Sequence, residues 1–150
     1  MTEGEAVPGI DPVCRFIRPD CWDDDDQRPT PEAFKASDRT LSVFHISRVT
    51  SNGDALRSLC FGTLEGAGEA ILTADHFRKF AEEVIRIHSP LNFVVPNVVW
   101  RPEDVHSDWV KWKDAHANVE TSSGKREFPD RYREILAERC TVTQAPTIST

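Results

Sequence analysis

The sequence contains no long apolar run and no amino-terminal targeting signal. No stretch approaches the ~20 apolar residues that a membrane-spanning helix needs. The first residues, Met1–Pro8, have neither the basic start nor the apolar stretch of a secretory signal peptide. We therefore expect a cytoplasmic protein that does not associate with membranes.

Cysteine is scarce and widely spaced. The closest of the four cysteines are Cys14 and Cys21, which have six residues between them and no histidine nearby, whereas zinc ligands come in closer pairs. A cytoplasmic compartment is reducing, so we expect free thiols rather than disulfides. Cys60 fits a small buried apolar residue, and no local motif supports a nucleophilic role for it. The sequence therefore predicts no metal and no bound cofactor.

The chain has 150 residues, of which 39% are hydrophobic and 29% charged, and a formal net charge of −7. This composition is typical of one globular domain. A chain of this length buries about 70% of its unfolded surface, so its core needs no metal or disulfide. Because a net negative charge repels phosphate backbones, we do not expect direct binding to duplex nucleic acid.

The negative charge is concentrated near the amino terminus, where residues 1–40 hold ten acidic and five basic side chains. The centre of this region is Asp23–Asp26 (Asp23, Asp24, Asp25 and Asp26), whose like charges repel one another and favour an exposed loop. A divalent-cation loop would need spaced oxygen ligands and a glycine, which this run lacks. A solvated turn and a nucleic-acid-like surface for a basic partner remain as interpretations.

Hydrophobic periodicity predicts an α+β domain over residues 13–140, with flexible tails at 1–12 and 141–150. We expect a small mixed or antiparallel sheet packed with about three to four helices. The expected strands are 13–18, 41–46, two short strands within 61–72, and an edge strand around Pro96 that includes 98–100. The expected helices are a turn or two after Thr30, then 55–60, 74–88, a helix opened by Pro102, and 129–139.

The helix predicted after Pro102 has an aromatic stripe at steps of four, three, four and three: Val105, Trp109, Trp112, His116 and Val119. One interpretation is that the tryptophans cap the core. The other is a groove wall that docks a partner or stacks a planar ligand.

Catalytic motifs are not evident among the five histidines, because none belongs to an H-E-x-x-H or H-x-H motif or a local triad signature. The run Asp104–Asp108 is rich in ligand-type side chains. Residues two apart on a helix point in different directions, however, so a single metal there would require a loop.

One segment resembles a group of small, uncharacterised bacterial proteins. The shared features are an arginine-proline start, an R-P-[TS]-x-x-A-F segment and a following L-S-V strand. They appear here as Arg18-Pro19, Trp22, Arg28-Pro29-Thr30-Pro31-Glu32-Ala33-Phe34-Lys35, Leu41-Ser42-Val43 and Ser47-Arg48-Val49. The resemblance covers residues 15–50, about a quarter of the chain, and implies no known activity.

Two functions follow from these observations. The first, which we favour, is a small acidic interaction or accessory protein of a bacterial multigene system, without catalytic activity. It would bind a protein partner through Asp23–Asp26 or through Trp109 and Trp112, and a homo-oligomer is compatible with it.

The second function is a small enzyme that handles a nucleotide or NAD. In it, Arg18 holds a phosphate, Trp22 stacks a ring, and Ser42 and His45 lie on the strand beneath, with Arg28 as a further ligand-binding residue. The order of arginine strand, serine strand and later glutamate (Glu103 or Glu120) is loosely similar to that of ADP-ribosyltransferase-like enzymes. The competing interpretation of Arg18 and Arg28 is that each pairs with the acidic loop.

Overall fold

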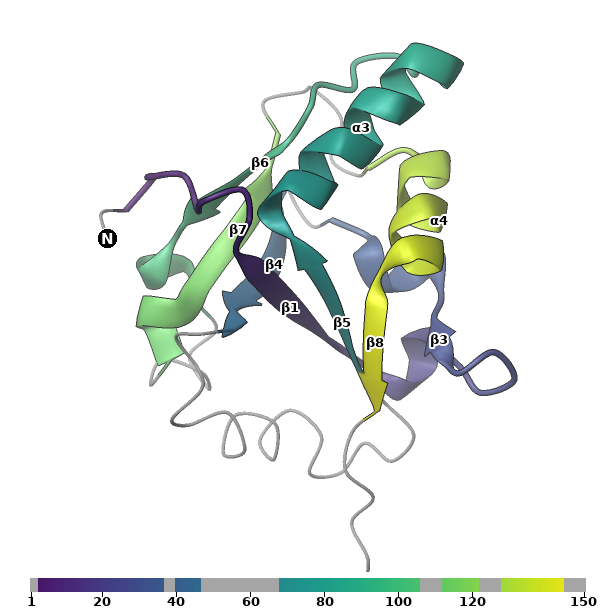
Figure 1. Cartoon of the computed structure of the whole chain (residues 1–150), viewed down its shortest axis with the longest axis horizontal. Helices are drawn as coiled ribbons and strands as arrows, with labels where there is room; N and C mark the ends of the chain where they lie inside the picture. Colours follow the sequence, from purple (N-terminus) through teal and green to yellow (C-terminus); the bar gives the residue numbers. More distant parts are fainter. Residues whose placement is uncertain (1–2, 37–39, 47–67, 106–111, 122–127, 145–150) are drawn as a thin grey trace, which may run out of the picture.

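The computed structural model describes residues 3–36, 40–46, 68–105, 112–121 and 128–144. These residues form a six-stranded antiparallel sheet, a two-stranded sheet and two α-helices (Figure 1). The large sheet has the order β6-β7-β4-β1-β5-β8. Its strands are β1 (Pro12–Ile17), β4 (Thr40–His45), β5 (Gly68–Thr73), β6 (Asn97–Trp100), β7 (His116–Glu120) and β8 (Thr141–Gln144). The predicted α+β class is therefore confirmed.

The smaller elements precede β4 or follow β6. The strands β2 (Trp22–Asp23) and β3 (Arg28–Pro29) form the two-stranded sheet. The short 3-10 helices include η1 (Pro19–Cys21), η2 (Pro31–Phe34) and η4 (Pro102–Asp104). Each of these three starts with proline, whose missing N–H costs nothing at the first helical positions.

The helix α3 (Ala74–His88) occupies the range that its periodicity predicts. The Thr73 side chain accepts a hydrogen bond from the His76 backbone N–H, while the His76 ring accepts one from the Thr73 N–H. This reciprocal cap satisfies two amide groups that a helix start leaves without partners. The apolar stripe of Phe77, Ala81 and Val84 is buried against the sheet.

The second helix is α4 (Asp130–Arg139), whose inward residues Tyr132, Ile135 and Leu136 are buried as predicted. It packs beside α3 on the same face of the sheet (Figure 1). The Tyr132 hydroxyl donates a hydrogen bond of 2.7 Å to the Phe77 carbonyl and so links the two helices.

The prediction of three to four helices was wrong for the part of the chain that the structure describes. In the described part of the segment after Pro102, residues 102–104 and 112–115 are 3-10 turns, and His116–Glu120 is strand β7. The alternation of Ala117 and Val119 with His116 and Asn118 suits a strand, and pairing with β4 and β6 on either side outweighs the helical spacing. The predicted helix 55–60 and residues 106–111 lie outside the described residues.

The sheet has two different faces. The face under α3 and α4 holds the main core, which includes Leu41 and Val43 of β4 and Ala117 and Val119 of β7. The opposite face carries the alternate residues of the same strands. Part of it is a smaller apolar cluster of Cys14, Phe44, Trp112 and Ala115, and part is polar.

The chain ends are more structured than the sequence suggested. Residues 4–7 lie along the outer edge of β6, where Gly4 and Val7 donate backbone hydrogen bonds to Trp100 and Val98 and Glu5 accepts one from Trp100. Val7 is buried in the core. At the other end of the sheet, residues 141–144 form β8 instead of a tail. The segment predicted as an edge strand is β6, which stands at one end of the strand order, but its outer side is bonded to residues 4–7 and is not left open.

Two further findings concern the described residues. None of their helices is long and apolar enough to cross a membrane. Cys21 and Cys140 are free thiols, Cys14 is buried, and Cys60 lies outside the described residues.

Candidate functional site

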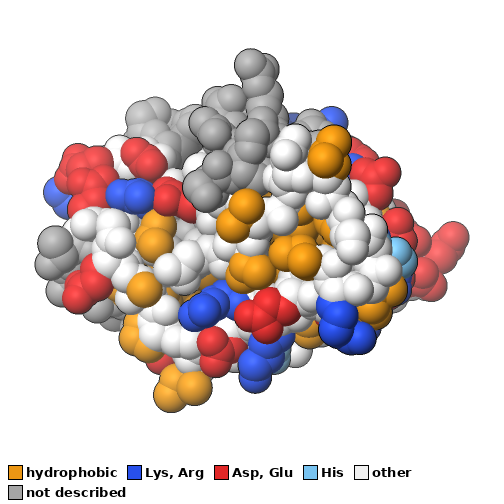
Figure 2. Space-filling view, turned by 90° about the horizontal axis from the view of Figure 1, so that it is seen from above, with side chains coloured by type: hydrophobic (Ala, Val, Ile, Leu, Met, Phe, Trp, Pro, Cys, Tyr) orange, Lys and Arg blue, Asp and Glu red, His pale blue; other side chains and the backbone are white. Residues whose placement is uncertain are grey.

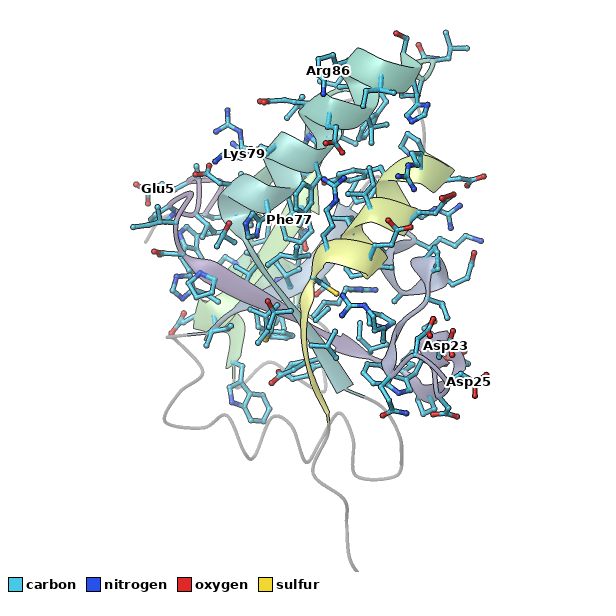
Figure 3. The ribbon with its side chains drawn as sticks, turned by 45° about the vertical axis from the view of Figure 1, so that its right-hand side comes forward. Glu5, Asp23, Asp25, Phe77, Lys79 and Arg86 are labelled. Atoms are coloured by element: carbon cyan, nitrogen blue, oxygen red, sulfur yellow. The ribbon has the colours of Figure 1, made fainter. Side chains whose placement is uncertain are left out.

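The acidic run forms the loop of the β2–β3 hairpin. The Asp23 carboxylate accepts backbone hydrogen bonds from Asp25 at 2.9 Å and from Asp26 at 3.2 Å, which folds the loop back on itself. Asp24, Asp25 and Asp26 are exposed. Figure 3 shows Asp23 and Asp25 at the outer end of the hairpin, away from the large sheet. The run therefore presents its charges to solvent.

Arg28 follows this loop and points at the carboxyl end of α4. Its guanidinium donates hydrogen bonds to the backbone carbonyls of Ala137 (3.1 Å), Glu138 (3.0 Å) and Cys140 (2.6 Å). These carbonyls belong to the helix end, where the last acceptors lack intrahelical donors and a cation is favoured. Arg28 is thus engaged with α4 instead of with the acidic loop.

A groove of about 310 Å³ lies between the hairpin and α4. We call it the acidic groove. Its walls carry four carboxylates and one guanidinium, and the described residues that line it are Asp23, Asp26, Arg28, Pro29, Thr30, Pro31, Glu134, Ala137 and Glu138. In Figure 2 acidic side chains gather at the right-hand end of the molecule, the end at which Figure 1 places the hairpin. Because four carboxylates face one guanidinium, the described lining of the groove has a net negative charge.

The residues predicted to hold a nucleotide do not gather at one place. The Arg18 side chain is 78% exposed and lies 3.6 Å from the Asp20 carboxylate. Trp22 is only 7% exposed and belongs to the core, so its ring is not available for stacking. Its indole nitrogen has no hydrogen-bond partner among the described residues.

Ser42 and His45 lie on opposite faces of β4. His45 shares the face of Leu41 and Val43, as the alternation predicts, and is buried. Its Nε2 atom lies 2.8 Å from the Asp11 carboxylate, and its ring packs at a tilt against Trp100, with 5.2 Å between the ring centroids. These contacts tie β4 to the residues before β1 and to β6. Ser42 points to the other face, so the two side chains do not share a site.

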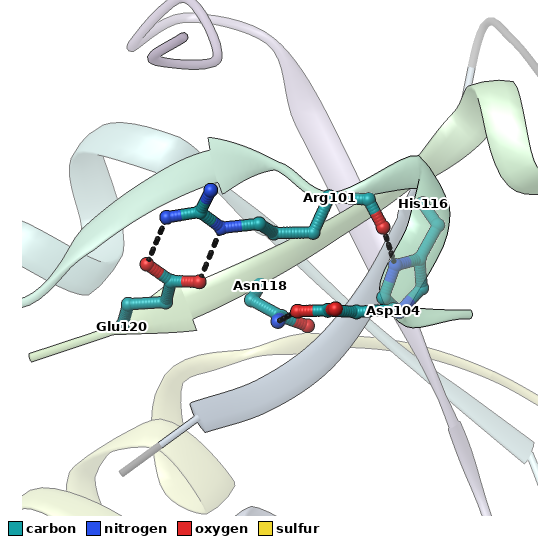
Figure 4. A network of polar contacts seen from close by, with 5 residues as sticks. All are labelled: Arg101, Asp104, His116, Asn118 and Glu120. Atoms are coloured by element: carbon teal, nitrogen blue, oxygen red, sulfur yellow. Dashed lines mark hydrogen bonds and ion pairs between the residues drawn. The ribbon is translucent and has the colours of Figure 1, made fainter. Parts of the chain in front are cut away.

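Ser42 instead meets His116 of β7. The Ser42 Oγ and His116 Nε2 atoms are 2.6 Å apart, and His116 Nδ1 lies 2.7 Å from the Arg101 carbonyl oxygen (Figure 4 shows the second contact). A carbonyl can only accept, so Nδ1 carries the proton and Nε2 accepts the hydroxyl proton of Ser42. The imidazole is therefore held in one tautomer and one orientation.

Burial lowers the pKa of His116, against smaller raising effects from the Arg101 carbonyl and the Asp104 charge. His116 is 1% exposed, whereas Ser42 is half-buried and Asp104 is exposed. Because the lowered pKa favours the uncharged imidazole at neutral pH, His116 is able to accept a proton there.

Two further polar contacts extend this network along β7 (Figure 4). The Asn118 amide donates a hydrogen bond of 3.2 Å to the Asp104 carboxylate. Arg101 and Glu120 form a two-bond ion pair of 2.6 and 2.9 Å, which raises the pKa of Arg101. The network connects η4, β6 and β7 next to Ser42.

Below Ser42, the backbone is fixed by Arg15 of β1. The Arg15 guanidinium donates hydrogen bonds to the carbonyls of Ser42 at 2.8 Å and Ala33 at 2.6 Å. Burial lowers the pKa of Arg15 to about 10, so it keeps its charge at neutral pH. This contact holds the peptide of Ser42 to β1 where the pairing of β1 with β4 has ended.

Sequence reasoning named Ser42 but missed His116 as its partner. The two residues are 74 positions apart, and only the register of β4 with β7 brings them together. The available signal was the alternation of polar and apolar residues over 116–120, which identifies a strand with His116 and Asn118 on one face.

The structure does not show an exposed tryptophan surface for a partner among the described residues. Trp112 is 8% exposed and packs in the smaller apolar cluster, and Trp109 lies outside the described residues. Across the described ranges, no group of three or more His, Cys, Asp or Glu side chains is placed to hold a metal ion. A comparison of the chain with protein-family models, curated proteins and solved structures gives no match. The resemblance of residues 15–50 to small bacterial proteins stays a prediction.

Proposed function

We propose that this protein binds a basic segment of a protein partner in the acidic groove. The observation that carries the proposal is the placement of Asp23, Asp26, Glu134 and Glu138 around one groove, where the described lining residues include a single cation, Arg28, that is bonded to backbone carbonyls of α4. Carboxylates from two different elements face a common space there. A lysine or arginine side chain entering it would meet several negative charges.

Two of the groove carboxylates, those of Glu134 and Glu138, also form ion pairs with Arg131 of the same helix. Glu134 and Glu138 lie 3.3 and 3.6 Å from Arg131, and their side chains are 45% and 59% exposed. Ion pairs at this exposure are worth about 1 kcal/mol or less. A partner that displaces Arg131 therefore loses little. The charge of the groove supports fast, salt-sensitive association with a cationic surface.

The experiment is a titration of the protein with a fluorescent lysine- and arginine-rich peptide at low and moderate salt. The test variant combines Asp26→Asn and Glu138→Gln, which removes two charges from the groove. The matched control combines Glu82→Gln and Glu103→Gln, which removes two charges from exposed positions on α3 and η4. We expect the test variant to weaken peptide binding about tenfold, equivalent to about 1.4 kcal/mol, and the control to leave it nearly unchanged.

Equal weakening by both variants would show attraction to net charge alone and would contradict a groove-specific function. An unchanged affinity of the test variant would do the same. A peptide of glutamate residues serves as the negative control for the ligand. Circular dichroism of each variant establishes that its fold is retained.

A further inference from the structure

The Ser42–His116 pair is separate from the acidic groove, and its geometry points to a chemical activity. We propose that Ser42 and His116 form a nucleophile and general-base pair that reacts with carboxylic esters. Three observations carry this proposal. The hydroxyl and the imidazole are in hydrogen-bond contact at 2.6 Å, the far side of the imidazole is anchored, and the serine is half-buried instead of enclosed.

The anchoring matters because a base must present a lone pair to the nucleophile. The Arg101 carbonyl accepts the Nδ1 proton of His116, which leaves the Nε2 lone pair directed at Ser42. The edge contact between the Phe44 and His116 rings, 5.5 Å between centroids, also restricts the ring. The pair is therefore arranged before any substrate arrives.

The facing strand supplies a hydrogen-bond donor beside the nucleophile. Asn118 is the residue directly opposite Ser42 in the register of β4 and β7. Directly opposed side chains of an antiparallel pair have Cβ atoms about 5 Å apart. The Asn118 amide nitrogen carries two hydrogens, of which one bonds to Asp104. In the proposed reaction, the second hydrogen of this amide would donate to the substrate oxygen on which negative charge develops.

In the first step, the Ser42 oxygen forms a bond to the ester carbonyl carbon while its proton moves to His116 Nε2. The tetrahedral intermediate then collapses, the bond to the alkoxy group breaks, and the leaving alcohol takes the proton from His116. In the second step, water attacks the acyl-serine and gives a proton to His116, which returns it to Ser42 as the carboxylic acid leaves. The ester and one water become an acid and an alcohol, and the pair is regenerated.

We infer the class of substrate from the hydrogen-bond partner of His116 Nδ1, the nitrogen that faces away from Ser42. Nδ1 faces a neutral carbonyl, not a carboxylate, so the imidazolium is stabilised by the Arg101 carbonyl and, to a smaller extent, by the exposed Asp104 nearby. A weakly stabilised imidazolium suits a leaving group that departs readily, such as the alcohol of an activated ester. The amine of an amide is a poorer leaving group and depends more strongly on protonation by the imidazolium. The other charged groups of this network, Arg101 and Glu120, neutralise each other.

The test is labelling of the whole protein with a fluorophosphonate. The Ser42 oxygen would bond to phosphorus, fluoride would leave, and the serine proton would pass to His116. Intact-mass spectrometry counts the adducts and peptide mapping locates them. We expect one adduct, on Ser42, and a labelling rate at least about 100-fold lower in His116→Asn, within the range that a general base contributes. Ser89→Ala, at the exposed end of α3, is the matched control and should label normally.

The labelling rate should also fall as acidic pH places a proton on His116. Peptide mapping is done on the unaltered protein, so the result does not depend on the folding of any variant. A folded protein that acquires no adduct, or an adduct on a residue other than Ser42, would overturn the proposal. A rate unaffected by His116→Asn in a folded variant would overturn the role of His116. Because the acidic groove plays no part in this reaction, its double variant should label at the normal rate.

Discussion

Arg28 donates a hydrogen bond of 2.6 Å to the carbonyl of Cys140, a residue 112 positions later in the sequence. The same guanidinium bonds to the carbonyls of Ala137 and Glu138. One side chain of the small sheet thus closes the end of α4 just before the chain enters β8. The hairpin and the last strand of the large sheet are held in a fixed relation through it.

This contact predicts that Arg28→Lys destabilises the protein by about 1–3 kcal/mol, because an ammonium group does not reproduce the fork that reaches several carbonyls. Urea unfolding measures the difference. Arg18→Lys is the control, since its side chain is 78% exposed, and it should change the free energy of unfolding by less than about 0.5 kcal/mol. Equal effects of the two variants would contradict the structural role of Arg28.

The burial of Trp22 predicts that two substitutions at this position differ in their cost to the free energy of unfolding. Trp22→Ala removes a buried ring and should cost about 3–5 kcal/mol. Trp22→Phe keeps most of the packing and removes a buried indole N–H that lacks a partner among the described residues, so it should cost much less. Thermal unfolding followed by circular dichroism measures both. A nearly neutral Trp22→Ala would place the ring in solvent and revive its role as a stacking surface.

Tyr132 is the single tyrosine of the chain, so its ionisation can be observed directly by ultraviolet absorbance. Burial raises its pKa well above the usual value of about 10. The folded protein then binds this proton more tightly than the unfolded chain, and stability falls as pH rises above about 10. We expect tyrosinate absorbance to appear together with alkaline unfolding. Absorbance that appears before unfolding would contradict this prediction, and Tyr132→Phe should remove the signal.

The burial of His116 predicts that the stability of the protein falls as the pH becomes acidic. Its pKa is lowered in the folded state by burial, so the unfolded chain binds the proton more readily. Stability therefore falls as pH drops below the ordinary histidine value of about 6.5. We expect the free energy of unfolding to decline more steeply from pH 7.5 to pH 5 in the unaltered protein than in His116→Asn. The control is Ser89→Ala at the exposed end of α3, which removes no titratable group and should leave the slope unchanged.

The sequence predicted those elements whose pattern is local. The stripe of Phe77, Ala81 and Val84 identified α3, and the alternation of Leu41, Val43 and His45 identified β4 and its inner face. The strand β7 was mistaken for part of a helix because His116 and Val119 also fit steps of three and four. Pairing with β4 and β6 decides between the two patterns, and this pairing involves residues far away in the sequence.

The same limit applies to the candidate site. Ser42 was identified as a site residue, but its contact with His116 depends on strand register and has no local signature. Arg28 was a candidate ligand-binding residue of the nucleotide hypothesis, whereas its bonds to Cys140 show a structural role that only the folded arrangement of β3 and α4 defines.

Residues 4–7 cover β6, and this placement affects how the protein tolerates truncation. Without them, the backbone of Val98 and Trp100 would lose the hydrogen-bond partners that Gly4, Glu5 and Val7 provide. A bare outer strand rich in β-branched and aromatic residues is a template for aggregation. A recombinant version that begins after Val7 should therefore precipitate more readily, and an affinity tag is better attached beyond β8.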